Sequence, residues 1–234
     1  MDRLGRITML GRNSSDLTAV ILAGALGLEG CEIFSDVPGV YSADPYVVKN
    51  AKAFDKIPYE NIIEMSKSGA KVLHHGAVEE SKKRDVKIVC RSTSGDIGTI
   101  VGDGNWQNSV TSFEKIEVLS FSSSKVRDTV ESKLTFSGIP SFKMWREGRT
   151  LLIVSLENRV ASSIIAKFSS QYLIVTGLAM VTTIKEKKVE RRLIEAQALK
   201  KYVIETHEKL YINGGSQVKK SLTKAKSNFS NLLV

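Results

Sequence analysis

The stretch Cys31-Glu32-Ile33-Phe34-Ser35-Asp36-Val37-Pro38-Gly39-Val40 decides the fold class of this 234-residue chain. Its first half is typical of a strand, and the Pro38-Gly39 pair supplies the backbone angles of a tight turn. An alanine-rich apolar run at residues 17–23 comes before the strand, and the Ser and Asp residues at 14–16 are N-cap types, so the sequence predicts a helix there. That helix is apolar on nearly every face, and we expect it to be buried between layers.

Helix and strand signals continue to alternate up to about residue 105. Pro58 stands at the start of a helix over 59–68, and a second helical stretch follows at 71–84. Buried-type strands are predicted at 86–91 and 98–101. This alternation indicates an α/β fold, with a mainly parallel sheet between helices.

The order of helix and strand signals changes between residues 110 and 184. A strand at 117–121, a helix at 125–136, a hairpin, a helix at 159–168 and a strand at 172–176 follow one another in the order βαββαβ. We expect a small antiparallel sheet with two helices on one face, which is an α+β module.

Residues 185–234 carry a local charge of +7, whereas the other 184 residues carry only +2. The sequence predicts one amphipathic helix over 185–211 followed by a basic tail. Such a charge excess suits nucleic acid or acidic lipid, but a solvated helix with a loose C-terminus is the favoured interpretation. For stacking on bases, the region offers only Tyr202, Tyr211 and Phe229, and it contains no recognised nucleic-acid-binding module.

The overall composition is that of a globular protein, with 42% hydrophobic and 25% charged residues. It excludes a disordered, collagen-like or disulfide-based chain, and the uncharged stretch 168–184 is too short and polar to span a membrane. Cys31 and Cys90 lie in apolar runs, so we expect reduced core thiols in a cytoplasmic protein. The neighbouring His74 and His75 lack a third ligand, and no metal site is predicted.

Three segments in register give the first part a family resemblance: residues 10–16 (LGRNSSD), 36–45 (DVPGVYSADP) and 65–74 (MSKSGAKVLH). Together they resemble the aspartate kinases of the amino-acid kinase superfamily. The resemblance implies phosphorylation of the L-aspartate side-chain carboxylate by ATP, with Mg²⁺ carried by the nucleotide, as the first step of lysine, threonine and methionine synthesis. Family members commonly continue into ACT regulatory modules, which are βαββαβ units, so residues 110–184 are expected to be ACT-like.

The resemblance also implies a role for particular residues. Arg12 would hold the α-carboxylate of aspartate, and Ser15 would donate a hydrogen bond at the mouth of the following helix. Asp16 would belong to the catalytic centre and organise a phosphate-facing lysine, and Lys71 would reach the ATP phosphates. Simple capping by Ser15 and Asp16 is compatible with these roles. The adenine and ribose of ATP would be surrounded by Ser35, Asp36, Tyr41 and Asp44.

The chain departs from the family pattern in three ways. Tyr46 stands where an arginine commonly helps to hold nucleotide phosphates, and His74-His75-Gly76 replaces the family's common His-Pro-Arg. The largest departure is that no Lys-Phe-Gly-Gly segment precedes residue 10. Residues 1–105 therefore resemble the C-terminal, nucleotide-side part of a kinase domain, and a truncated or split product is expected. Such a half-domain exposes apolar surface, so we expect self-association or pairing with a chain that supplies the other half.

Two readings of the function follow. The first is an aspartate kinase, whose ACT-like module has lysine or threonine as candidate effectors. The second is a catalytically silent regulatory or assembly subunit derived from such a kinase.

Overall fold

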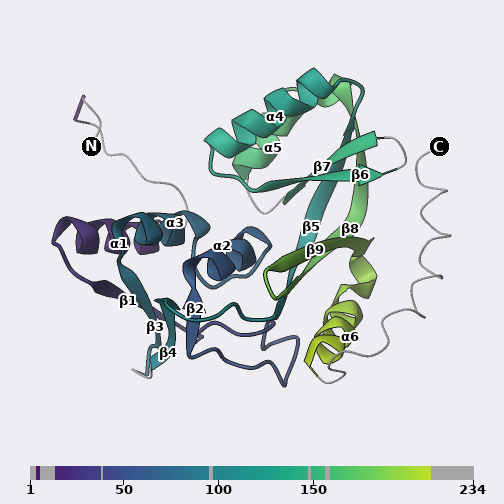
Figure 1. The fold of residues 1–234 in the computed structure, drawn as a ribbon. Coiled ribbons are helices and arrows are strands. Elements are labelled where there is room, and N and C mark those ends of the chain that lie inside the picture. Colours follow the sequence, from purple (N-terminus) through teal and green to yellow (C-terminus); the bar gives the residue numbers. More distant parts are fainter. Residues whose placement is uncertain are drawn as a thin grey trace.

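The computed structural model describes residues 4–5, 14–37, 39–94, 97–146, 149–155 and 159–211. Two sheets, each with its own helices, make up this part of the chain (Figure 1). The first comprises α1 (Ser15–Ala25), β1 (Gly30–Ser35), β2 (Lys56–Pro58), α2 (Tyr59–Lys67), α3 (His75–Arg84), β3 (Lys87–Ser92) and β4 (Ile97–Gly102). The second comprises β5 (Ser109–Phe121), α4 (Ser124–Phe136), β6 (Ser141–Arg146), β7 (Arg149–Ser155), α5 (Arg159–Ala166), β8 (Tyr172–Lys185), β9 (Lys188–Glu195) and α6 (Leu199–Tyr211).

The first sheet has the strand order β1-β3-β4-β2. The pairs β1–β3 and β2–β4 are parallel, and only the β3–β4 pair is antiparallel, which confirms the predicted α/β class with a mainly parallel sheet. Helix α3 contacts both α1 and α2, and all three helices lie on the same side of the sheet (Figure 1). Beneath them, Ile57, Ile62 and Ile88 are fully buried and form the centre of the first core.

Helix α1 is less buried than its sequence predicts. Only Val20 and Ala23 are buried, whereas the side chains of Leu22 and Leu26 are 56% and 71% exposed. The reason is that α1 packs on α3 and β1 from one side, and no other described element covers its outer face. The expectation that this helix is buried between layers is therefore wrong for the described residues.

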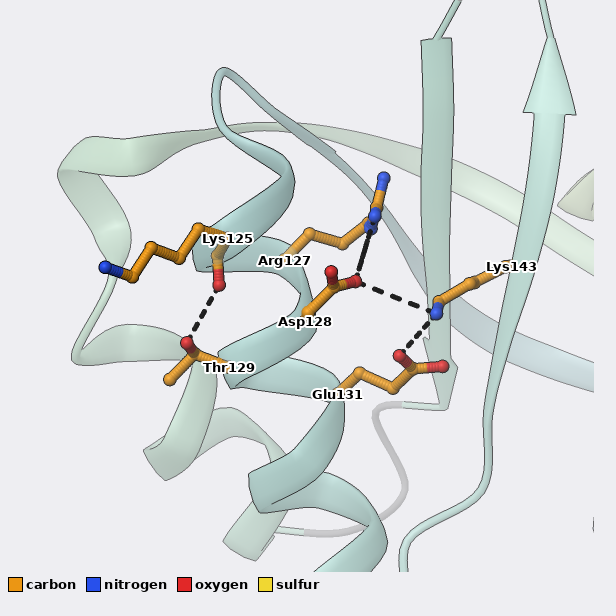
Figure 2. Close-up of polar contacts among 6 residues, drawn as sticks. All are labelled: Lys125, Arg127, Asp128, Thr129, Glu131 and Lys143. Atoms are coloured by element: carbon orange, nitrogen blue, oxygen red, sulfur yellow. Dashed lines mark hydrogen bonds and ion pairs between the residues drawn. The ribbon is translucent and has the colours of Figure 1, made fainter.

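The second unit has the predicted βαββαβ order and an antiparallel sheet, β6-β7-β5-β8-β9. Helices α4 and α5 lie together on one face (Figure 1) and bury Leu119, Leu134, Leu152 and Val154 between themselves and the sheet. On the outside of α4, the Lys143 ammonium of β6 pairs with Glu131 at 2.7 Å and with Asp128 at 3.7 Å (Figure 2). This unit thus has a complete helix-on-sheet core of its own.

The two units also share cores. Strands β5 and β8 are 13 and 14 residues long, and one end of the pair extends toward the first unit. There, Val110 and Ala179 pack with Ala43 and Val48, and Ile184 belongs to the core of the first sheet. The predicted boundary near residue 105 therefore marks a change of sheet but does not separate independent cores.

The predicted helix over 185–211 is wrong in its first half. Residues 188–195 form strand β9, which pairs with β8 from Leu178↔Glu195 to Lys185↔Lys188. Glu186 and Lys187 both have positive φ, as required by a tight hairpin turn. Val189 and Leu193 are four residues apart, a spacing that suits one face of a strand as well as one face of a helix.

No helix in the described ranges is long and apolar enough to cross a membrane.

Candidate functional site

A cavity of about 340 Å³ lies where helices α1 and α3 begin. Three of the predicted site residues meet at this cavity: Ser15, Asp16 and Lys71. The rest of its lining comes from Ser66, residues 69, 70 and 72–75, and Phe113. The first and third sequence segments of the resemblance therefore meet at one site, although 48 residues separate them.

The Asp16 carboxylate joins the starts of the two helices. Its Oδ2 accepts a hydrogen bond from the His74 amide at 3.4 Å, and its Oδ1 lies 3.4 Å from the Ser15 hydroxyl. Ser14, at the N-cap of α1, makes no side-chain capping bond. The half-buried Asp16 instead reaches across to the residue that precedes α3.

The cavity has the electrostatic character of an anion site. Backbone N–H groups at a helix N-terminus have no partner within the helix, and the helix dipole places partial positive charge there. Two helices, of 11 and 10 residues, begin at this cavity, and the side chain of Lys71 is exposed beside them. Two N-termini and a lysine suit the multiple negative charges of a phosphate chain.

Two buried polar atoms at the cavity lack a partner in the described part of the chain. They are the Ser66 hydroxyl oxygen and the His74 Nδ1. Leaving a buried polar atom without a hydrogen bond costs about 1–3 kcal/mol, so such atoms often indicate a ligand or an ordered water. Both atoms therefore suit a polar molecule in the cavity.

His74 and His75 also line this cavity, although the sequence predicted no role for them in the site. Their rings lie 4.6 Å apart, and burial is the main cause that lowers the pKa of His75, followed by the neighbouring His74. A lowered pKa keeps the His75 ring neutral near pH 7. Nothing in the described ranges groups three or more His, Cys, Asp or Glu side chains into a metal site.

The loop that carries Lys71 rests on the second unit. Ser68 O accepts a hydrogen bond from Thr111 Oγ1 at 3.0 Å, and Gly69 has a φ of +103° with no room for a Cβ beside the Ser112 carbonyl. The predicted helix over 71–84 begins only at His75, so Lys71 lies in this loop. The position of Lys71 therefore depends on strand β5, a contact that its local sequence does not reveal.

The other four predicted residues lie in a separate segment that begins at the carboxyl end of β1. The Ser35 hydroxyl donates to the Val37 carbonyl at 2.5 Å, and Asp44 Oδ1 accepts from the Tyr46 amide at 2.8 Å. Asp36 is exposed and Tyr41 is half-buried, next to Ala53 in an isolated bridge. None of these four residues is among the lining residues of the cavity, and Arg12 lies outside the described residues.

A buried hydroxyl fixes this second segment to the sheet. Thr99 Oγ1 on β4 accepts the Val40 amide at 2.8 Å and donates to the Phe54 carbonyl at 2.6 Å. A Cβ on Gly39 would lie only 2.6 Å from the same oxygen, so this position requires glycine. The glycine of the predicted Pro-Gly turn is therefore needed for close approach to β4.

The two cysteines are free, as predicted. Burial raises the pKa of the Cys90 thiol to about 12, and the nearby Asp16 carboxylate adds to the effect. The thiol is therefore protonated at neutral pH and is a core group without nucleophilic character.

Comparison with known proteins shows what this chain is similar to. Residues 1–92 match the model of the amino acid kinase family. The aspartokinase of Mycobacterium bovis is 38% identical over 136 residues, which are 57% of this chain and 30% of that protein.

Solved structures agree at the level of the fold. Escherichia coli aspartokinase III in complex with aspartate and ADP has a TM-score of 0.71 at 22% identity, covering 88% of this chain and 58% of the other. The same enzyme in complex with lysine and aspartate has a TM-score of 0.65 at 23% identity, over 89% of this chain and 58% of the other. The chain thus spans less than a third of the curated relative and somewhat more than half of the solved enzyme. Residues 1–92 are thus similar to the amino acid kinase family, and the relatives described above are aspartokinases.

Proposed function

We propose that this chain is the nucleotide-side part of an aspartate kinase. In the reaction, the β-carboxylate oxygen of L-aspartate attacks the γ-phosphorus of MgATP, the bond to the bridging oxygen breaks, and 4-phospho-L-aspartate and ADP leave. Phosphoryl transfer of this kind depends on positioning and charge neutralisation more than on covalent participation by the protein. The Mg²⁺ ion enters with the nucleotide as part of the substrate.

The observation that carries this proposal is the meeting of Asp16, Lys71 and two helix N-termini at one cavity. The Lys71 ammonium would neutralise phosphate charge, and Asp16 would orient Lys71 while it holds the start of α3 through the His74 amide. The partnerless Ser66 hydroxyl and His74 Nδ1 would hydrogen-bond to phosphate oxygens or to their waters.

The remaining predicted residues divide between the two substrates. Arg12 and Ser15 would bind aspartate, since a planar guanidinium matches a carboxylate with two parallel hydrogen bonds. The segment with Ser35, Asp36, Tyr41 and Asp44 would surround the adenosine, with Tyr41 beside the base and Asp44 near the sugar. In support, Escherichia coli aspartokinase III, which shares the fold, has been solved with aspartate and ADP.

The proposal also includes a regulatory role for the second unit. Residues 110–184 would act as an ACT-like module of a cytoplasmic biosynthetic enzyme, with lysine or threonine as candidate effectors, and aspartokinase III has also been solved with lysine. The exposed leucines of α1 suit a homo-oligomer or a second chain that covers them.

The test compares Lys71→Ala with Lys83→Ala, an exposed lysine of α3 that does not line the cavity. Binding of a fluorescent ADP analogue with Mg²⁺ is measured by titration, and aspartate-dependent acyl phosphate is trapped with hydroxylamine. Loss of a charge-assisted contact should weaken nucleotide binding roughly 10- to 100-fold in Lys71→Ala. Lys83→Ala should bind like the unchanged chain.

The outcomes separate the two readings of the chain. Binding and turnover that both fall in Lys71→Ala would support an active kinase. Binding that falls in Lys71→Ala without any turnover would favour the catalytically silent subunit. Equal nucleotide binding by both variants would contradict the assignment of the cavity.

A further inference from the structure

Helix α6 places a buried histidine against the segment assigned to adenosine. The side chain of His207 is only 1% exposed, and its Nε2 lies 2.9 Å from the hydroxyl of Ser42, which is fully buried. The two residues are 165 positions apart. Ser42 lies directly between Tyr41 and Ala43, so the contact joins the C-terminal helix to the middle of this segment.

Ser42 also forms three hydrogen bonds with backbone groups of neighbouring segments. Its amide donates to the Lys52 carbonyl, its carbonyl accepts from the Val110 amide, and its Oγ accepts from the Lys52 amide, each at 2.8 Å. The Ser42 hydroxyl keeps its own hydrogen, which it can donate to Nε2 when His207 is neutral and carries its hydrogen on Nδ1. One side chain on α6 therefore completes the bonding that closes the loop 42–52.

Neighbouring contacts hold α6 in the same place. The rings of His207 and Tyr211 stack at 4.7 Å, and the Tyr211 hydroxyl donates to the Asn108 carbonyl. The Lys52 ammonium lies 5.1 Å from the centre of the Tyr211 ring. Apolar contacts of Val203 with the cluster that contains Ala43 and Val48 complete the interface.

We propose that His207 is a positioning residue for nucleotide binding: through Ser42 it holds the segment Tyr41–Asp44 in its binding conformation and couples it to the second unit. This inference rests on the proposed function, because it assigns a control point to the same nucleotide site. The coupling has a direct physical path, since α6 follows β9 at the edge of the second sheet, and its histidine bonds to a residue of the first unit.

The contact also depends on the charge of the histidine. Protonation would put the second N–H on Nε2, so this nitrogen could no longer accept the Ser42 hydroxyl. The charged groups that act on His207 are Lys52 of the loop and Glu208 of its own helix, and burial and Lys52 lower the pKa of His207 while Glu208 opposes them. The neutral form is therefore the one that holds Ser42, and the contact should weaken as the pH falls below about 6.5.

The test uses the full chain with His207→Leu, His207→Gln and Lys200→Ala, an exposed position on the same helix. Protection of the Ser42 and Lys52 amides is measured by hydrogen exchange, and Kd is measured for a fluorescent ADP analogue. Loss of one buried hydrogen bond should lower protection and weaken nucleotide binding by about tenfold in His207→Leu. His207→Gln, whose amide can still bond to Ser42, should recover most of both, and Lys200→Ala should match the unchanged chain.

A pH series gives a readout that mere packing would not change. Protection factors of Ser42 and Lys52 should fall between pH 7 and pH 5 in the unchanged chain and stay level in His207→Gln, which has no titrating ring. A level profile in the unchanged chain would contradict the role of neutral His207.

The remaining outcomes distinguish failure of the His207 contact from failure of the proposed nucleotide site. Unchanged protection in His207→Leu would overturn the anchor, and lower protection with unchanged Kd would overturn the positioning role. If the unchanged chain and Lys200→Ala bind no nucleotide, the proposed function fails and the positioning role fails with it. If they bind and only His207→Leu is weakened, both stand.

Discussion

The two units of the molecule differ in where their apolar surface lies. In the second unit, α4 and α5 bury Leu134 and Leu152 completely against an antiparallel sheet, although no sequence motif distinguishes these elements. In the first unit, α1 begins at the candidate site and leaves Leu22 and Leu26 largely exposed. In this chain, the recognisable motifs lie at the candidate site. How completely each unit buries its apolar side chains depends on residues outside those motifs.

The sharpest test of this comparison is one leucine-to-alanine change in each unit. Leu134→Ala removes a fully buried side chain and should lower the free energy of unfolding by about 2–5 kcal/mol, because a cavity is left in the core. Leu22→Ala, on the outer face of α1, should change it by no more than about 0.5 kcal/mol. Urea denaturation followed by circular dichroism measures both.

A large loss in Leu22→Ala would break the comparison. It would show that the outer face of α1 is covered in solution, by another copy or by another chain. Sedimentation of the unchanged chain and of Leu22→Ala at the same concentration would then identify the association.

A second test concerns the contact between the Lys71 loop of the first unit and strand β5 of the second unit. Gly69→Ala should destabilise the fold by roughly 2–4 kcal/mol, because φ at this position is +103° and a Cβ would collide with the Ser112 carbonyl. Gly27→Ala is the matched control, since its φ is +68° and no atom lies within 4 Å of the added carbon, so only backbone strain of about 1 kcal/mol is expected. Thermal denaturation of both variants gives the difference.

Nucleotide binding of the same pair adds a functional readout. Gly69→Ala should also weaken binding, because the loop that carries Lys71 begins there, whereas Gly27→Ala should not. Equal effects on stability would argue that β5 does not constrain the Lys71 loop.

The smallest expected effect is electrostatic and concerns His75. Burial, the neighbouring His74 and Lys67 lower the pKa of His75 in the folded chain, while Glu79 and the Gly138 backbone oppose them. In the unfolded chain a histidine titrates near pH 6.5, so the unfolded state takes up the proton first as the pH falls. The free energy of unfolding should therefore decrease below about pH 6.5 and level off once the folded form is protonated.

His75→Gln should remove this share of the pH dependence, and denaturation curves from pH 5 to pH 8 measure it. Lys67 and Glu79 both remain in the variant. Any pH dependence that comes from their ion pair should therefore be the same in both chains. An unchanged pH profile in His75→Gln would show that other groups dominate the acid response.

Local sequence was enough to predict several elements and part of the site. The apolar run after Ser14, the βαββαβ order and the choice of Asp16 and Lys71 as candidate site residues were all accessible, because caps, periodicity and family motifs are local features. Strand β9 was not, since the Val189 and Leu193 spacing suits either period and only pairing with β8 selects the strand. Phe113 at the cavity carries no local signal at all, since strand β5 brings it there from the second unit.

By itself, the sequence determined that this chain has an α/β part with aspartokinase-like motifs, followed by an α+β module. Only the tertiary structure decided which of those residues meet. Asp16 and Lys71 face one cavity because two helices begin side by side, and Ser42 meets His207 because α6 returns to the first unit. The physical reason is that such contacts join residues far apart in the chain, so their energy depends on how the two sheets pack and not on any local preference.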